Sequence, residues 1–126
     1  MVIYKSFEGL ECWKAANVVR RNVKEIIKKF PPHEKYDLAD NMRRASRSTT
    51  NNIAEGFGRF HYQENIQFCR ISRGSLFELI NQFIITFDEK YITEQEYKNG
   101  REQIETALRL LNGYINYLEQ QKNKKK

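Results

Sequence analysis

Three arginines within little more than one helical turn are the residues of this sequence best suited to bind a ligand. Arg43, Arg44 and Arg47 come just before a run of serine, threonine and asparagine. At about 100° per residue, Arg43 and Arg47 share one face of a helix, whereas Arg44 points about 100° away. A guanidinium group binds two phosphate oxygens at once, so Arg43 and Arg47 predict contacts with a nucleic-acid backbone.

Three further arginines could extend this basic patch. They are Arg59, Arg70 and Arg73. The alternative is ion pairing with glutamates of the same chain or of a neighbouring subunit. The candidate acids are Glu55, Glu64 and Glu78. For Arg44 we favour pairing, while for Arg43 and Arg47 both interpretations stay open.

A second set of polar residues lies along the same segment. It consists of Arg44, Ser48, Asn52 and Glu55. Asn52 and Glu55 lie about one helical turn apart, and each would need hydrogen-bonding partners inside a packed bundle. We therefore predict a buried polar cluster that fixes the register of this helix, in preference to a ligand-binding role.

The sequence lacks the patterns of an enzyme or a metal site. No glutamate has a histidine three residues later, which is the pattern of a di-metal site in a helical bundle. No glycine-rich phosphate loop, CxxC pair or nucleophile elbow is present. His33 and His61 fall near expected loops, and Cys12 and Cys69 fit buried free thiols in a reducing compartment. We expect no catalytic residue, no metal, no cofactor and no enzymatic activity.

Composition and charge favour one soluble domain with an anionic partner. The chain has 126 residues, of which 40% are hydrophobic and 30% charged, and its formal net charge is +6. Residues 1–60 hold 12 Lys and Arg against 7 Asp and Glu, and such a field favours polyanions such as RNA or DNA. Neither a membrane span nor a secretory signal is recognisable, so we expect a cytoplasmic location and no membrane partner.

Apolar residues recur at helical spacing in four segments. The expected helices span residues 10–29, 38–57, 62–88 and 94–120. Short connections between them predict an all-α, antiparallel, up-down-up-down four-helix bundle over residues 1–121. The lysine-rich residues 122–126 should form a disordered tail. The third and fourth segments carry apolar faces two lines wide, which one bundle cannot hide, so we expect self-association.

Several residues predict where these helices begin, end or approach one another. Asp37 should cap the second helix, and Thr93 with Glu96 should form a capping box for the fourth. Gly56 and Gly58 should end the second helix through left-handed backbone geometry. A glycine in the middle of the third helix costs about 1 kcal/mol relative to alanine, so Gly74 predicts close approach of another helix.

The segment RRASRSTTNNIAEGFGR also carries a family resemblance. It resembles the signature IRRA-x-x-SIPSNIAEGYGR of bacterial four-helix-bundle proteins associated with the 23S rRNA intervening sequence. The stretches FEGLECWKAA, FPPHEKYDL and RISRGSLFEL resemble further motifs of that family. Thr49 and Thr50 depart from it, since they stand where the family commonly has Ile-Pro.

The resemblance implies a fold, an assembly and a function class. Members of the family, and the distantly related accessory variability determinant proteins of diversity-generating retroelements, form ring-like homopentamers. The latter bind nucleic acid and a reverse transcriptase. By resemblance we predict a non-catalytic homo-oligomer, most simply a pentamer, that binds the backbone of RNA or DNA or acts as a scaffold. The alternative is a protein–protein interaction module with no nucleic-acid ligand.

Overall fold

Four long helices make up the part of the chain that the structure, a computed structural model, describes, which is residues 6–124. They are α1 (Glu11–Ile27), α2 (Leu38–Phe57), α3 (Tyr62–Asp88) and α4 (Glu94–Lys124). Two short 3-10 helices, η1 (Phe7–Gly9) and η2 (Pro32–Glu34), precede α1 and α2. Residues 6–124 contain no strand. The fold is therefore an all-α four-helix bundle, as the apolar periodicity predicted.

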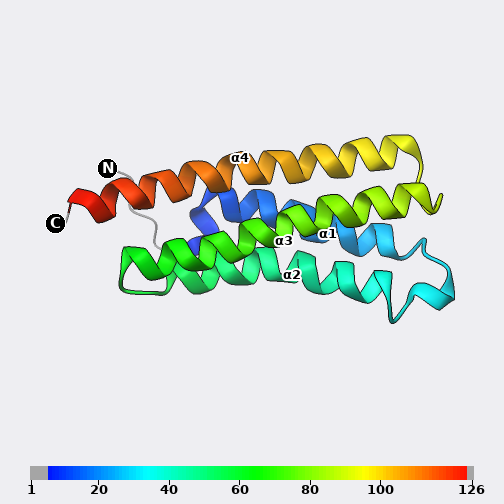
Figure 1. The fold of residues 1–126 in the computed structure, drawn as a ribbon, viewed down its shortest axis with the longest axis horizontal. Helices are drawn as coiled ribbons and strands as arrows, with labels where there is room; N and C mark the ends of the chain where they lie inside the picture. Colours follow the sequence, from blue (N-terminus) through cyan, green and yellow to red (C-terminus); the bar gives the residue numbers. More distant parts are fainter. Residues whose placement is uncertain (1–5, 125–126) are drawn as a thin grey trace.

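The four helices lie side by side along one long axis, and the chain reverses its direction along this axis at each connection (Figure 1). α1 packs against α2 and α4, and α3 packs against the same two helices. Each helix contributes to one core, for example through Val19, Met42, Leu76 and Leu111, which are at most 1% exposed. α1 and α3 therefore occupy opposite corners of the bundle.

The bounds of α2 and α3 agree with prediction, whereas the ends of α1 and α4 differ. α1 ends at Ile27, two residues early, because the N–H groups of Lys29 and Phe30 bond the carbonyls of Ile26 and Ile27 in tighter turns. α4 continues to Lys124, so the expected disorder is wrong for residues 122–124. Lys122 Nζ donates to Gln63 at 2.8 Å, which ties this end of α4 to α3. Residues 125 and 126 lie outside the described residues.

The capping prediction is confirmed for α4 and wrong for α2. The Thr93 N–H donates to Glu96 Oε1 at 2.9 Å, and the Glu96 N–H donates to Thr93 Oγ1 at 3.1 Å, as in a capping box. Asp37 makes no side-chain cap. The Leu38 N–H instead donates to the carboxylate of Glu34 at 3.4 Å, because the η2 turn brings that side chain over the start of α2.

The glycines serve different purposes from those predicted. Gly58 has φ −75°, and no described glycine has positive φ, so the left-handed ending of α2 is wrong. A Cβ on Gly56 would lie 2.6 Å from Asn65 Oδ1, so Gly56 admits a close approach of α3. A Cβ on Gly100 would overlap the Phe83 ring of α3. Around Gly74 a Cβ would meet nothing within 4 Å, so no other helix within residues 6–124 approaches it closely.

The outer side of α3 remains partly apolar. Five of its large hydrophobic side chains are 37% to 57% exposed, and we call them the α3 apolar face. They are Ile71, Phe77, Ile84, Ile85 and Phe87. On α4, by contrast, only Tyr117 belongs to the exposed large hydrophobic residues among those described. No helix within residues 6–124 is both long enough and apolar enough to cross a membrane.

Candidate anion-binding groove

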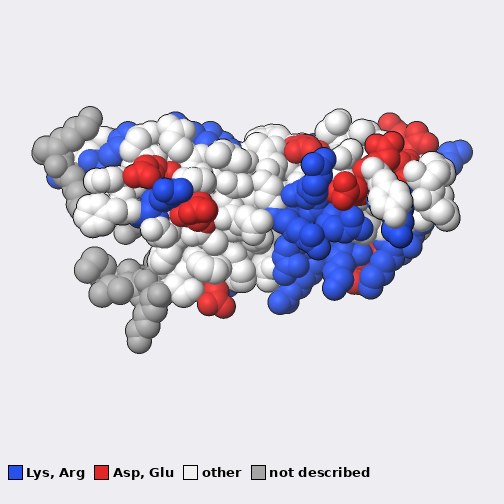
Figure 2. All heavy atoms as spheres, turned by 90° about the horizontal axis from the view of Figure 1, so that it is seen from below, with Lys and Arg blue, Asp and Glu red and all other residues white. Residues whose placement is uncertain are grey.

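A groove of about 350 Å³ lies between α1 and α2. Its walls carry five cationic side chains and no acidic one. The lining residues are Arg20, Val23, Lys24, Ile27, Lys28, Arg43, Ser46 and Arg47. Figure 2 shows Lys and Arg side chains gathered into one patch on the face of the molecule seen from below. We call this feature the α1/α2 groove.

The two walls of the groove follow from helical spacing. Arg20, Lys24 and Lys28 recur every four residues and so stand in one row along α1, about 6 Å apart. Arg43 and Arg47 form a second row at the same spacing on α2. Between the rows, Val23 is 1% exposed and anchors α1 in the core. The packing of the two helices therefore brings two rows of like charge together.

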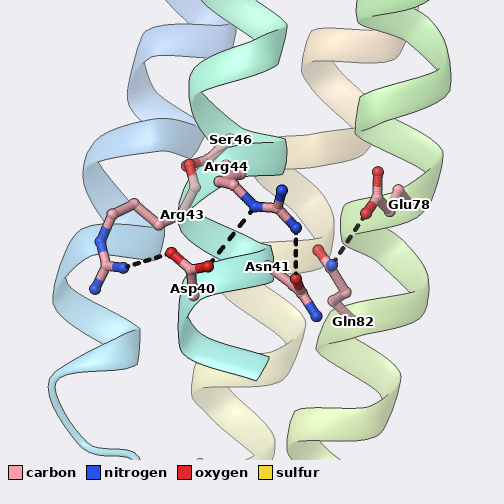
Figure 3. A network of polar contacts seen from close by, with 7 residues as sticks. All are labelled: Asp40, Asn41, Arg43, Arg44, Ser46, Glu78 and Gln82. Atoms are coloured by element: carbon pink, nitrogen blue, oxygen red, sulfur yellow. Dashed lines mark hydrogen bonds and ion pairs between the residues drawn. The ribbon is translucent and has the colours of Figure 1, made fainter. Parts of the chain in front are cut away.

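Three of the five cations have a partner that orients them. Both Nε and Nη2 of Arg20 donate to Asn17 Oδ1, at 3.0 and 2.7 Å. Lys28 lies 3.1 Å from a Glu25 oxygen, and Arg43 Nη1 lies 3.4 Å from Asp40 Oδ1 (Figure 3). These two carboxylates belong to neighbouring positions of the same helices and do not line the groove.

The other two cations have no such partner. The side-chain ammonium of Lys24 on α1 and the guanidinium of Arg47 on α2 make no hydrogen bond or ion pair with any residue from 6 to 124, and both side chains are exposed. The groove therefore keeps positive charge that its own surroundings do not neutralise. An anion between the two walls would reduce the repulsion between them and supply acceptors to both.

Hydroxyl groups allow α2 to form this wall despite its poor helix formers. Ser46 Oγ donates to the Arg43 carbonyl at 2.9 Å, and Thr49 Oγ1 donates to the Ser46 carbonyl at 2.7 Å. Thr50 Oγ1 donates to the Arg47 carbonyl at 3.3 Å. Each buried hydroxyl thus finds its acceptor one turn back along its own helix, so it can be buried without a partner from another helix.

The other predicted phosphate-binding arginines lie away from the groove. Arg59, beyond the far end of α2, lies 3.6 Å from both Glu55 and Glu64 and stacks over the Phe68 ring. Arg70 and Arg73 extend from α3 toward α4. The prediction that these three arginines extend one patch with Arg43 and Arg47 is therefore wrong, and any contact of theirs with a ligand stays a prediction.

The predicted polar cluster forms only in part. Asn52 Nδ2 donates to the carbonyl and to Oγ of Ser48, at 2.8 and 2.9 Å. Ser75 Oγ of α3 donates to Ser48 Oγ at 2.8 Å, so Ser48 links α2 to α3. Glu55 points instead to Arg59, at the end of α2.

Arg44 also lies outside that cluster. Its Nη2 donates to Asn41 Oδ1 at 2.8 Å, and its Nε lies 3.8 Å from Asp40 Oδ2 (Figure 3). The side chain is 71% exposed, so this is a surface interaction within α2. Arg44 does pair, as we favoured, but with Asp40 and Asn41 and not with the glutamates we considered.

A comparison with known protein families identifies the family of this chain. The family model described as 23S rRNA-intervening sequence protein matches residues 8–113. The chain belongs to this family. The matched region includes the whole α1/α2 groove and most of α4, so the groove is part of the family domain. No curated protein sequence matches the chain.

The sequence did not lead us to predict three of the groove residues. Arg20, Lys24 and Lys28 were not among the residues predicted to bind phosphate. Their four-residue spacing was visible in the sequence, on the flank of the apolar stripe that contains Val19 and Val23. What the sequence did not show is that this flank faces the one that carries Arg43 and Arg47.

The two cysteine thiols are poor nucleophiles at neutral pH. Cys12 and Cys69 are free and buried, as predicted, and burial raises the pKa of each thiol to about 12. Both thiols therefore stay protonated and weakly nucleophilic. Within residues 6–124, no three His, Cys, Asp or Glu side chains come together in a group that could hold a metal ion. Among residues 6–124, the α1/α2 groove is the feature whose lining is chemically suited to an anion.

Proposed function

We propose that this protein is a non-catalytic module that binds the sugar–phosphate backbone of RNA or DNA in the α1/α2 groove. The observation that carries the proposal is a recess lined by five cations and no acid. Arginine and lysine neutralise phosphates and release condensed counterions, which supplies most of the affinity in sequence-independent binding. Backbone contacts carry no base information, so binding should be largely indifferent to sequence.

We also propose that the four helices run antiparallel within each bundle and that the bundles assemble into a ring-like homopentamer. The α3 apolar face supports self-association, because exposed apolar patches on a soluble domain commonly mark interfaces. Gly74 lies on the same helix in open space, where a second copy could approach its backbone closely. The proposed number of subunits, five, rests on the resemblance to relatives that form pentameric rings. A ring would repeat the groove around its axis, so that weak contacts combine through avidity.

The setting that fits this role is a bacterial cytoplasm, where nucleic acids are abundant and free thiols such as Cys12 and Cys69 remain reduced.

The second candidate is a protein–protein interaction module without a nucleic-acid ligand. The observation that favours it is Phe60, which is 91% exposed in the connection between α2 and α3. An exposed phenylalanine contributes little to its own fold and suits an anchor for a protein partner.

The test is fluorescence anisotropy with labelled RNA and DNA across a salt series. The variant Arg43→Gln/Arg47→Gln removes two charges from the groove, and Arg70→Gln/Arg73→Gln removes two charges from the α3 surface as a matched control. On single strands, affinity should fall with salt at a log–log slope of about −0.7 per phosphate contacted. The groove variant should flatten that slope by about 1.4, whereas the control should change it little.

Two results would count against the proposal. Absence of binding at low salt would leave the protein-interaction module as the better account. Equal losses in the two double variants would mean that only net charge matters and that the groove is no specific site. Assembly is tested separately by light scattering, where a monomer mass at micromolar concentration would contradict the ring.

A further inference from the structure

We infer that the α1/α2 groove takes the backbone of one unpaired strand, in preference to a duplex. The inference rests on the proposed function and names the form of nucleic acid that the groove fits. Two features of the groove support it, namely its small volume between two packed helices and its short length along them, while the absence of aromatic residues from its lining bears on how the strand is oriented.

The width of the groove suits a single chain. Packed helices lie about 8–10 Å apart, and a volume of about 350 Å³ is at the small end of the range for sites that hold a small molecule. Lys24 and Arg47, the two groove cations without an internal partner, stand on opposite walls. A single strand between the walls reaches both cations at once. A duplex is too wide to enter a recess of this volume, so it would lie across the rim and could not place a phosphate between the two walls.

The length of the groove limits the contact to a few nucleotides. Arg20 and Lys28 are eight residues apart, which corresponds to about 12 Å along α1. Even at the stacked spacing of about 3.4 Å per nucleotide found along one strand of a duplex, the groove covers at most about three phosphates, and an unstacked strand places fewer in it. A flexible strand can follow this straight course, whereas each strand of a duplex winds away from it.

The lining sets the orientation of the strand. Val23, Ile27 and Ser46 are its uncharged members, and none is aromatic. Proteins that bind unpaired strands normally hold the bases by stacking them on aromatic rings, which this groove does not offer. The phosphates therefore face inward between the cations, and the bases point outward. This orientation predicts no preference for base sequence.

General electrostatics makes the opposite prediction, which gives the inference a sharp test. A duplex carries the higher charge density, so a merely basic surface binds it at least as well as a single strand. The experiment compares one labelled oligonucleotide, alone and annealed to its complement, by anisotropy at the same low salt. We expect the single strand to bind at least tenfold more tightly.

The same anisotropy measurement on two variants tests whether the preference for single strands comes from the groove. Lys24→Gln/Arg47→Gln should weaken single-strand binding about tenfold and flatten its salt slope by about 1.4, with little change for the duplex. Arg70→Gln/Arg73→Gln, with the same loss of charge, should leave the preference unchanged. Equal denaturation midpoints would show that both variants remain folded.

The outcomes separate this inference from the proposed function. If the duplex binds as tightly as the single strand and the groove variant weakens both, the inference fails while the proposed function stands. If the single strand is preferred but the groove variant has no effect, the strand binds elsewhere and the inference fails again. If neither form binds at low salt, the proposed function fails as well.

Discussion

The α1/α2 groove and the seam between α3 and α4 both display cations, but only in the seam does the facing helix provide partners for them. In the seam, Arg70 Nη2 lies 3.2 Å from Glu119 Oε1, and Arg73 Nη1 donates to Asn112 Oδ1 at 2.9 Å. In the groove, the row on α1 faces a second row of cations on α2. The type and number of arginines therefore do not locate a site. What matters is which residues the facing helix provides.

This difference also concerns stability. The Arg70–Glu119 pair is 43% and 36% exposed, so solvent screens it and its contribution is at most about 1 kcal/mol. The groove places like charges on both walls, which opposes packing. A protein that needed only a stable bundle would gain from an acid on one of the walls. We interpret the absence of such an acid as a requirement of the proposed ligand.

The largest expected effect concerns the core that supports both regions. Burial raises the pKa of Cys12 from 9.0 to about 12, so the folded state keeps this thiol protonated where the unfolded state ionises it. The corresponding stability is fully present below pH 9 and is lost as the pH rises from 9 to 12. One such thiol accounts for a loss on the order of 4 kcal/mol, measurable as a falling urea midpoint.

The control for this prediction is Cys12→Val, which removes the titrating group with little change in volume. Its midpoint should fall less steeply above pH 9 than that of the wild type, with the remaining decline due to Cys69. If the two curves run parallel, the thiol does not govern alkaline unfolding. If binding in the groove and the helical signal are lost at the same pH, the groove and the seam belong to one cooperative unit.

The second prediction sets the packed seam against the exposed face of α3. Gly100→Ala places a methyl group against the Phe83 ring, which is 1% exposed and has little room to move. We expect a loss of about 1–3 kcal/mol in the free energy of unfolding, measured with urea. In the dissociated bundle, Gly74→Ala has open space around it and should be stabilising by up to about 1 kcal/mol. Equal effects would mean that the seam is looser than described.

A third prediction concerns the turn that joins the two helices of the seam. Lys90 has φ 64°, the only positive φ of a non-glycine residue among those described, and the Tyr91 N–H closes the turn on the Thr86 carbonyl at 3.1 Å. Lys90→Gly should raise the free energy of unfolding by about 1 kcal/mol, because glycine adopts this geometry without strain. Lys90→Ala keeps the Cβ and should show no such gain.

The smallest effect compares single charges from the two regions. Arg70→Gln should cost a few tenths of a kcal/mol by removing its pair with Glu119. Arg47→Gln should leave stability unchanged or slightly raise it, because it relieves repulsion in the groove. Added salt should stabilise the wild type relative to Arg47→Gln, since screening weakens that repulsion. A loss of stability in Arg47→Gln larger than that in Arg70→Gln would reverse the comparison.

Features that depend on local sequence were predicted well. α2 and α3 begin and end where the apolar periodicity placed them, and the Thr93–Glu96 capping box forms as expected. Both signals act within a few residues of the chain. The Asp37 cap failed because a competing acceptor, Glu34, reaches the same N–H from the preceding turn. Such competition depends on the path of the connection, which residue types do not specify.

Features that depend on which helices face one another were predicted less well. Arg43 and Arg47 were recognised as a pair, but their α1 counterparts were not, because the flank of α1 that faces α2 is set by packing. Arg70 and Arg73 were grouped with them by charge, although their helix faces α4. Gly74 and Gly100 are equally conspicuous in the sequence, yet only Gly100 is close to another helix of the chain.

The position of α4 between α1 and α3 also has a consequence for synthesis. Helical hairpins joined by short turns form within milliseconds, whereas a ribosome adds roughly 5–20 residues per second. The 31 residues of α4 therefore take a few seconds to appear after α3 is complete. During that time the first three helices can be folded while the sides of α1 and α3 that α4 covers remain open. Translation, and not the folding reaction itself, thus sets the time at which the core closes.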